Sequence, residues 1–190
     1  MVETMTSSAW FASCKHALVL AAAAMAMPAP ALAAPESLAI SADASLRFGT
    51  FVVISAGSRT IAASGAVTNS GIFPVSSAPV GPAQFTVTYD RGNNSRVPLG
   101  ITFQLLLSNV SPVTQSGVRG TLSGFVTDLA GVPVLVPGRA VTITLPSCTA
   151  RTCSATFRVG ARLDVTRASG GAALTIVLPM TATLIASERL

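Results

Sequence analysis

Apolar and polar residues alternate with a period of two along most of the chain after residue 33, and helical periodicity is hard to find there. The clearest case is 155–165, where the apolar side chains fall on one face and the polar ones on the other. Residues 83–89, 99–107 and 141–145 repeat this pattern. Such alternation is typical of a β-strand with one buried face. We therefore predict a strand in each of these four segments.

Residues 172–178 differ from the other segments, because they are apolar on both faces except at Thr175. A run of this kind predicts a central strand that is covered on both sides. Turn-forming residues, chiefly Gly, Pro, Asn and Asp, separate the predicted strands. Many short strands with regular turns indicate an antiparallel sandwich or barrel. We see no internal repeat or linker, so residues 34–190 are predicted to form a single domain.

The first 33 residues have the anatomy of a secretory signal peptide. Lys15 and His16 precede an apolar run over 17–27, and a small-residue site follows that ends at Ala33. This order of basic, apolar and small residues predicts an N-terminal signal helix that is cleaved between Ala33 and Ala34. The mature protein is then exported to the periplasm, the cell surface or the medium.

The N-terminal region has two other interpretations, a transmembrane anchor and a lipid-modified cysteine. A transmembrane anchor needs about 20 apolar residues, whereas the run over 17–27 has 11. Lipid attachment at Cys14 is disfavoured because this cysteine lies before the apolar run rather than after it. We therefore expect no membrane insertion of the mature chain.

Two cysteines, Cys148 and Cys153, remain after the predicted cleavage. In an exported chain this close spacing indicates a disulfide formed in an oxidising compartment. The rival interpretation is half of a metal site, but the mature chain has no further Cys and no His to complete four ligands. We expect the bridge to staple the mouth of a hairpin between strands 140–145 and 154–165.

The mature chain lacks the residue types that most catalysis uses. Its only Lys and only His would be lost with the signal peptide, which removes the usual amine nucleophile and the usual proton shuttle near neutral pH. We predict that the protein is not an enzyme, with no catalytic, cofactor-binding or metal-binding residues. Calcium binding by Asp90, Asn93 and Asn94 is an alternative, although their spacing matches no calcium loop. Turn capping is the ordinary role for Asp90 in such a sequence.

Charge is spread thinly along the chain. Cleavage removes one Lys and one Glu, so the net charge of +5 is kept. The Arg residues are not clustered and are not interleaved with aromatic residues, which argues against a nucleic-acid partner. The charge predicts only a weak attraction to anionic cell-surface polymers.

The new N-terminus begins with an amphipathic segment, 38–48, predicted to be one strand. It is interpreted as the first strand of the protein's own sheet, or as a donor strand that completes the sheet of a neighbouring subunit. A third interpretation divides the segment, with 38–42 donated and 46–48 internal. The candidate donor positions are Leu38, Ile40, Ala42, Ala44, Leu46 and Phe48.

Three segments, 45–51, 81–88 and 157–163, resemble small secreted proteobacterial proteins that carry only a domain of unknown function. The strand containing Phe48-Gly49 is also similar to that of spore coat protein U and of chaperone-usher fimbrial subunits. The resemblance implies an immunoglobulin-like or pilin-like β-sandwich in the cell envelope or outside it, and no catalytic residues. The chain departs from the fimbrial pattern because its last seven residues, 184–190, lack an aromatic residue.

Two functions follow as hypotheses. The first is a structural or assembly protein of the cell envelope, fimbrial-subunit-like, whose partners are copies of itself or a periplasmic chaperone. The alternative is a monomeric secreted or periplasmic binding module that takes a glycan or another envelope ligand through loops such as 90–96 or 111–120.

Overall fold

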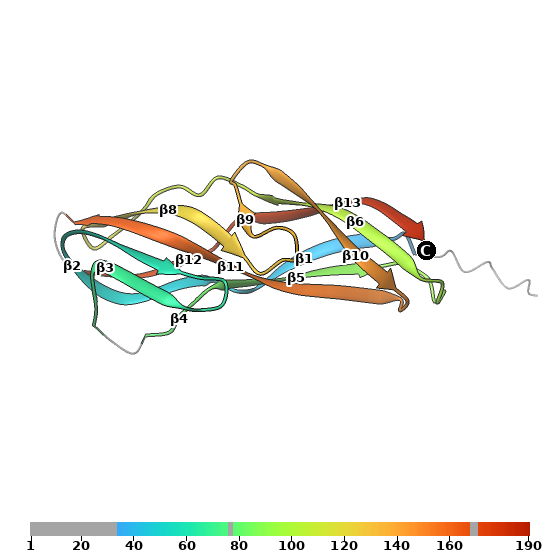
Figure 1. Cartoon of the computed structure of the whole chain (residues 1–190), viewed down its shortest axis with the longest axis horizontal. Coiled ribbons are helices and arrows are strands. Elements are labelled where there is room, and N and C mark those ends of the chain that lie inside the picture. The colour runs from blue at the N-terminus through green and yellow to red at the C-terminus, as the bar shows by residue number, and fades with distance from the viewer. Residues whose placement is uncertain (1–33, 76–77, 168–170) are drawn as a thin grey trace, which may run out of the picture. The chain divides into compact units, whose positions relative to one another are not determined.

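The computed structural model describes residues 34–75, 78–167 and 171–190, and it is all-β with no helix in those ranges (Figure 1). Those residues belong to one compact unit. The strands are β1 Ser37–Ala44, β2 Leu46–Ile61, β3 Val67–Pro74, β4 Val80–Gly81, β5 Ala83–Asp90, β6 Leu99–Leu107, β7 Val113–Gln115, β8 Val118–Thr127, β9 Val134–Leu135, β10 Ala140–Cys148, β11 Thr152–Arg167, β12 Gly171–Ile176 and β13 Met180–Arg189.

The strands form two antiparallel sheets. The larger sheet has the order β1-β5-β11-β2-β12, with β3 and β4 on β2 and with β8 on β11; β7 and β9 in turn pair with β8. The smaller sheet has the order β10-β6-β13. The first described strand, β1, therefore lies at one end of the larger sheet, and the last, β13, lies at an edge of the smaller one.

Strand β5 illustrates why the predicted alternation folds in this way. Its inward side chains, Phe85, Val87 and Tyr89, are at most 2% exposed, and the Thr residues between them face outward. Phe85 is directly opposite Phe157 of β11, and their rings stack with centroids 5.6 Å apart. Burial of such side chains is the main source of stability in a sheet of this kind.

The two sheets share one hydrophobic core. Phe103 and Leu105 of β6, in the smaller sheet, belong to the same buried cluster as Phe48 of β2 and Phe157 of β11, in the larger sheet. Gly160 of β11 lies directly against the end of β2, because a Cβ there would clash with the backbone of Ile61 and Ala62. The core is therefore continuous between the sheets.

Strand β2 contains a bulge at Gly49, where φ is +66° and the register with β12 shifts. The buried side chain of Arg59, later in the same strand, donates a hydrogen bond to the carbonyl of Phe48 beside this bulge. Burial lowers the pKa of this guanidinium from its ordinary value. Arg59 thus satisfies a carbonyl next to the bulge and stabilises the bend.

The four strands predicted from alternation are confirmed as β5, β6, β10 and β11, although three of them extend further than predicted. The prediction for 172–178 is wrong. Its strand, β12, pairs only with β2 among the described residues, and alternate side chains in 172–178 are exposed, including Val177, just after the strand, by 69%. Exposing small apolar side chains costs little, so an apolar run does not by itself establish that both faces are covered.

Candidate functional site

The N-terminal strand β1 pairs in antiparallel register with β5 of the same chain, from Ser37 opposite Asp90 to Ala44 opposite Gln84. Leu38 and Ile40 face the core but are only partly buried, and Ala42 is exposed. Among the described residues β1 has no second strand hydrogen-bonded to it in the larger sheet. It is therefore held mainly by a single main-chain ladder.

The prediction of one strand over 38–48 is wrong. The segment is divided at Ser45 into β1 and β2, and the register of β1 already shifts between Ala42 and Ala44. Leu46 and Phe48 lie in β2, fully buried, and they take no part in the pairing of β1 with β5. Both strands turn alternate side chains toward the same core, so the alternation continues across Ser45. The sequence pattern therefore gives no sign of the break.

The carboxylate of Glu36, just before β1, connects both sheets. It accepts hydrogen bonds from the hydroxyls of Tyr89 in β5 and Ser187 in β13, each at 2.7 Å. The bonds from Ser187 and then Tyr89 lower the pKa of Glu36, against a smaller opposing effect of burial. Burial, followed by the bond to Glu36, raises the pKa of Tyr89. Glu36 thus fastens the start of β1 where β1 and β13 lie close together.

A second polar contact fastens the other end of β1. The carboxylate of Asp43 accepts hydrogen bonds from the hydroxyls of Ser41 at 3.1 Å and Thr86 at 2.6 Å. The Thr86 hydroxyl also lies 2.8 Å from that of Thr156. This exposed network runs from β1 across β5 to β11.

The predicted disulfide between Cys148 and Cys153 is present, with the two Cα atoms 5.9 Å apart. The prediction that it staples a hairpin is wrong, because β10 belongs to the smaller sheet and β11 to the larger one. Consecutive strands are neighbours in a sheet only about two-thirds of the time, and here each pairs with strands from elsewhere in the chain. The bridge therefore closes a connection between the two sheets.

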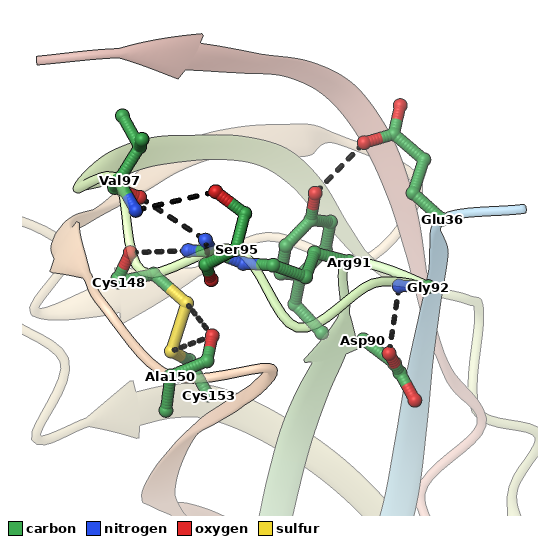
Figure 2. Close-up of a disulfide and its surroundings, with 10 residues drawn as sticks. Glu36, Asp90, Arg91, Gly92, Ser95, Val97, Cys148, Ala150 and Cys153 are labelled. Carbon is green, nitrogen blue, oxygen red and sulfur yellow. Dashed lines mark hydrogen bonds between the residues drawn. A yellow bond between two sulfur atoms is a disulfide. The ribbon is translucent and has the colours of Figure 1, made fainter. Parts of the chain in front are cut away.

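A buried arginine joins the disulfide loop to the loop after β5 (Figure 2). Arg91 is 4% exposed, and its guanidinium donates hydrogen bonds to the carbonyls of Ser95, of Val97 at 3.1 Å and of Cys148 at 2.6 Å. Its main-chain N–H donates to the carbonyl of Arg151 at 3.0 Å. Arg91 thus satisfies carbonyls that turn inward from two loops and fixes the loops against each other.

These two loops form the walls of an open cleft of about 630 Å³. Its lining includes one exposed arginine on each wall, Arg96 and Arg151. Arg151 makes an ion pair with Asp90 at 3.3 Å on this surface. The lining residues are Asn94, Ser95, Arg96, Thr149, Ala150 and Arg151.

Two of the three side chains proposed for calcium, those of Asp90 and Asn93, accept hydrogen bonds from the main chain of their own loop. Asp90 accepts the N–H of Gly92 at 2.8 Å, and Asn93 accepts the N–H of Ser95 at 3.0 Å. The bond from Gly92 is the main cause that lowers the pKa of Asp90, with Arg151 adding to it. The turn-capping role predicted for Asp90 is confirmed. In the described ranges no three Cys, Asp or Glu side chains come together as metal ligands.

The structure brings one of the two predicted ligand loops into the cleft. Residues 94–96 line it, whereas 111–120 is taken up by the hairpin of β7 and β8 and does not contribute. Sequence reasoning missed Arg91 and Glu36 as organising residues. Glu36 acts through partners far along the chain, and Arg91 joins nearby carbonyls to the distant carbonyl of Cys148. Nothing in the local sequence signals that the Arg91 side chain turns inward.

Residues 1–33, which include the predicted signal peptide and Ala33, lie outside the described residues. Ala34 is exposed and passes over Gly92, where φ is +70° and a Cβ would clash with the Ala34 carbonyl. The described residues contain no helix that could span a membrane. The disulfide is compatible with an oxidising, exported location.

Comparison with known proteins identifies a family but no function. A family model described as Domain of unknown function (DUF4402) matches residues 38–184, from inside β1 to inside β13. No curated protein and no solved structure matches the chain. The match includes strands of both sheets, both cysteines and both loops of the cleft. The chain therefore belongs to the DUF4402 family of domains of unknown function.

Proposed function

We propose that this protein is an exported structural or assembly protein of the cell envelope, fimbrial-subunit-like, whose strand β1 pairs between subunits. The observation that carries the proposal is the position of β1. It is the first strand of the described chain, it lies at the end of the larger sheet, and its inward side chains are only partly buried. A second copy of the chain offers an identical β5 to which β1 can bind in the same register.

Strand exchange of this kind needs no new interface. The bonds that β1 makes with its own β5 are the bonds it would make with the β5 of a neighbour, so the exchange is nearly neutral in contacts. Main-chain hydrogen bonds then supply affinity, and the side chains of Leu38 and Ile40 supply register. The division of the chain at Ser45 provides the point at which β1 separates from β2.

The fold type and location are part of the same proposal. Two antiparallel sheets with a common core fit an immunoglobulin-like or pilin-like β-sandwich. The likeness of the Phe48-Gly49 strand to spore coat protein U and fimbrial subunits supports an envelope role. The signal-like residues 1–33 and the disulfide support export, with the partners being further copies of the chain or a periplasmic chaperone. The absence of Lys and His from residues 34–190 supports a non-enzymatic role.

The experiment compares the size of three proteins, purified oxidised, by light scattering at several concentrations. The first is residues 34–190, the second is residues 45–190, and the third is residues 34–190 with Ile40→Asp. We expect oligomers for the first protein only, because a carboxylate at position 40 cannot enter the apolar face of β5. Monomers for all three, or the same oligomers for all three, contradict the proposal.

The cleft beside the disulfide favours a second candidate function, a monomeric binding module. It is a preorganised polar surface, fixed by a covalent bridge and by a buried arginine. Monomers in the size experiment, together with a ligand for this cleft, would favour this second candidate over assembly.

A further inference from the structure

The walls of the cleft are held more firmly than its exposed loops alone would suggest. On one side the loop 148–153 is closed by the disulfide, and on the other the loop 91–97 is fixed by the side chain of Arg91. A hydrogen bond from the main-chain N–H of Arg91 to the carbonyl of Arg151 joins the two loops. Loops fixed in advance lose little conformational entropy when they bind a ligand.

The charge of the cleft is positive and available. Arg96 lies on one wall and makes no ion pair among the described residues. Arg151 lies on the opposite wall, and its side chain remains 51% exposed although it pairs with Asp90. The lining thus carries two guanidinium groups, and only the carboxylate of Asp90 is paired with one of them. The net positive charge attracts an anionic group. Arginine presents a planar fork that matches a carboxylate.

The other lining groups fit hydroxyls better than rings. Asn94, Ser95 and Thr149 contribute an amide and two hydroxyls to the lining. No aromatic side chain lines the cleft, so stacking of bases, which single-stranded nucleic acids use, has no platform there. Its volume of about 630 Å³ is larger than a single small anion needs, and the cleft is open to solvent rather than enclosed, which leaves room for a polymer.

We propose that this cleft binds an acidic polysaccharide, with a sugar carboxylate between Arg96 and Arg151 and with neighbouring sugar hydroxyls on Asn94 and Thr149. The inference is independent of strand exchange by β1, since none of the lining residues belongs to β1. It rests instead on the binding-module candidate and names the ligand class for it. Binding by two exposed arginines is expected to be moderate in affinity and to weaken with salt.

The test measures binding of oxidised residues 34–190 to polygalacturonate by calorimetry, with neutral dextran and inorganic phosphate as comparison probes. We expect binding to polygalacturonate, none to dextran, and no competition by phosphate at equal charge concentration. The variant Arg96→Gln with Arg151→Gln is expected to bind about tenfold more weakly or worse, as loss of charge-assisted hydrogen bonds implies. Arg96→Gln alone serves as a second variant, because Arg96 has no ion pair that the fold depends on.

The matched control is Arg119→Gln with Arg139→Gln, which removes the same charge. Arg119 of β8 is opposite Thr166, near the end of β11 that is remote from Cys153. Arg139 precedes β10, at the end of that strand remote from Cys148. We expect the control to bind like the unchanged protein. Equal loss in both double variants would mean attraction by net charge only and would overturn the proposal. Absence of binding to polygalacturonate, or equal competition by phosphate, overturns it as well.

Discussion

Strands β1 and β5 are neighbours in the same sheet and carry similar alternating sequences, but they are held in different ways. β5 has a hydrogen-bonded strand on both sides, β1 and β11, and its inward side chains are at most 2% exposed. β1 has one ladder, two partly buried apolar side chains and the polar contacts of Glu36 and Asp43. The comparison teaches that burial fixes β5, whereas β1 depends on main-chain bonds and a few surface groups.

Segments with few buried contacts open at a lower free energy than the core does. We therefore expect β1 to leave its place without global unfolding, which is the step that exchange between subunits needs. The following predictions test this difference between the two strands, from the largest expected effect to the smallest.

Phe157→Ala is expected to have the largest effect, since it removes a buried ring that stacks on Phe85 of β5. The loss in free energy of unfolding is about 3 to 5 kcal/mol, the usual range for a buried Phe replaced by Ala. Urea denaturation followed by circular dichroism measures this loss, since residues 34–190 contain no Trp for a fluorescence signal. A loss no larger than that of a β1 variant would contradict the comparison.

Removing the disulfide with Cys148→Ser and Cys153→Ser should cost less. By the chain-entropy estimate a loop this short contributes about 2 kcal/mol. The bridge lies between the sheets, next to Tyr89 of β5, so its loss should also increase amide exchange in 91–97 and at the start of β1. Hydrogen exchange read by mass spectrometry checks this, and unchanged exchange in both segments would show that Arg91 alone fixes the loops.

Ile40→Ala is expected to destabilise the fold by about 1 kcal/mol, because only part of the side chain is removed from water in the folded state. Denaturation under the conditions used for Phe157→Ala gives the comparison directly. The matched control is Val87→Ala, the residue opposite Ile40 in β5, which is fully buried and should cost more. Equal losses for Ile40 and Val87 would mean that β1 is as firmly held as β5.

The smallest effect concerns Glu36 and pH. Its pKa is lower in the folded protein than in the unfolded chain, so its contribution to stability is present above the unfolded pKa and is lost as pH falls through the folded pKa. We expect amide exchange in β1 to rise, relative to β5, as pH falls below the ordinary pKa of an unfolded Glu, about 4.3, after correction for intrinsic exchange rates. Glu36→Gln should remove this relative pH dependence. The same dependence in the variant would assign it to another carboxylate.

The central strands could be predicted from the sequence because period-two alternation and burial coincide in them, as in 83–89 and 155–165. Predictions failed where alternation continues through a break, at Ser45, and where small apolar residues are exposed, in 172–178. The disulfide followed from spacing, but its place between the sheets did not. The cleft depends on Arg91 reaching Cys148, a contact between distant positions that no local pattern encodes.

The most direct test of exchange by β1 is disulfide trapping between two different variants of residues 34–190. One carries Ala39→Cys in β1, and the other carries Thr88→Cys in β5, the position opposite Ala39. The two variants are mixed and oxidised, and their masses are measured by intact mass spectrometry without reducing agent. The control mixture pairs Ala39→Cys with Gln84→Cys, a position that is out of register with Ala39. We predict a covalent heterodimer for the first mixture and much less for the control. Equal yields in the two mixtures, or no heterodimer in the first, would contradict exchange of β1 between subunits.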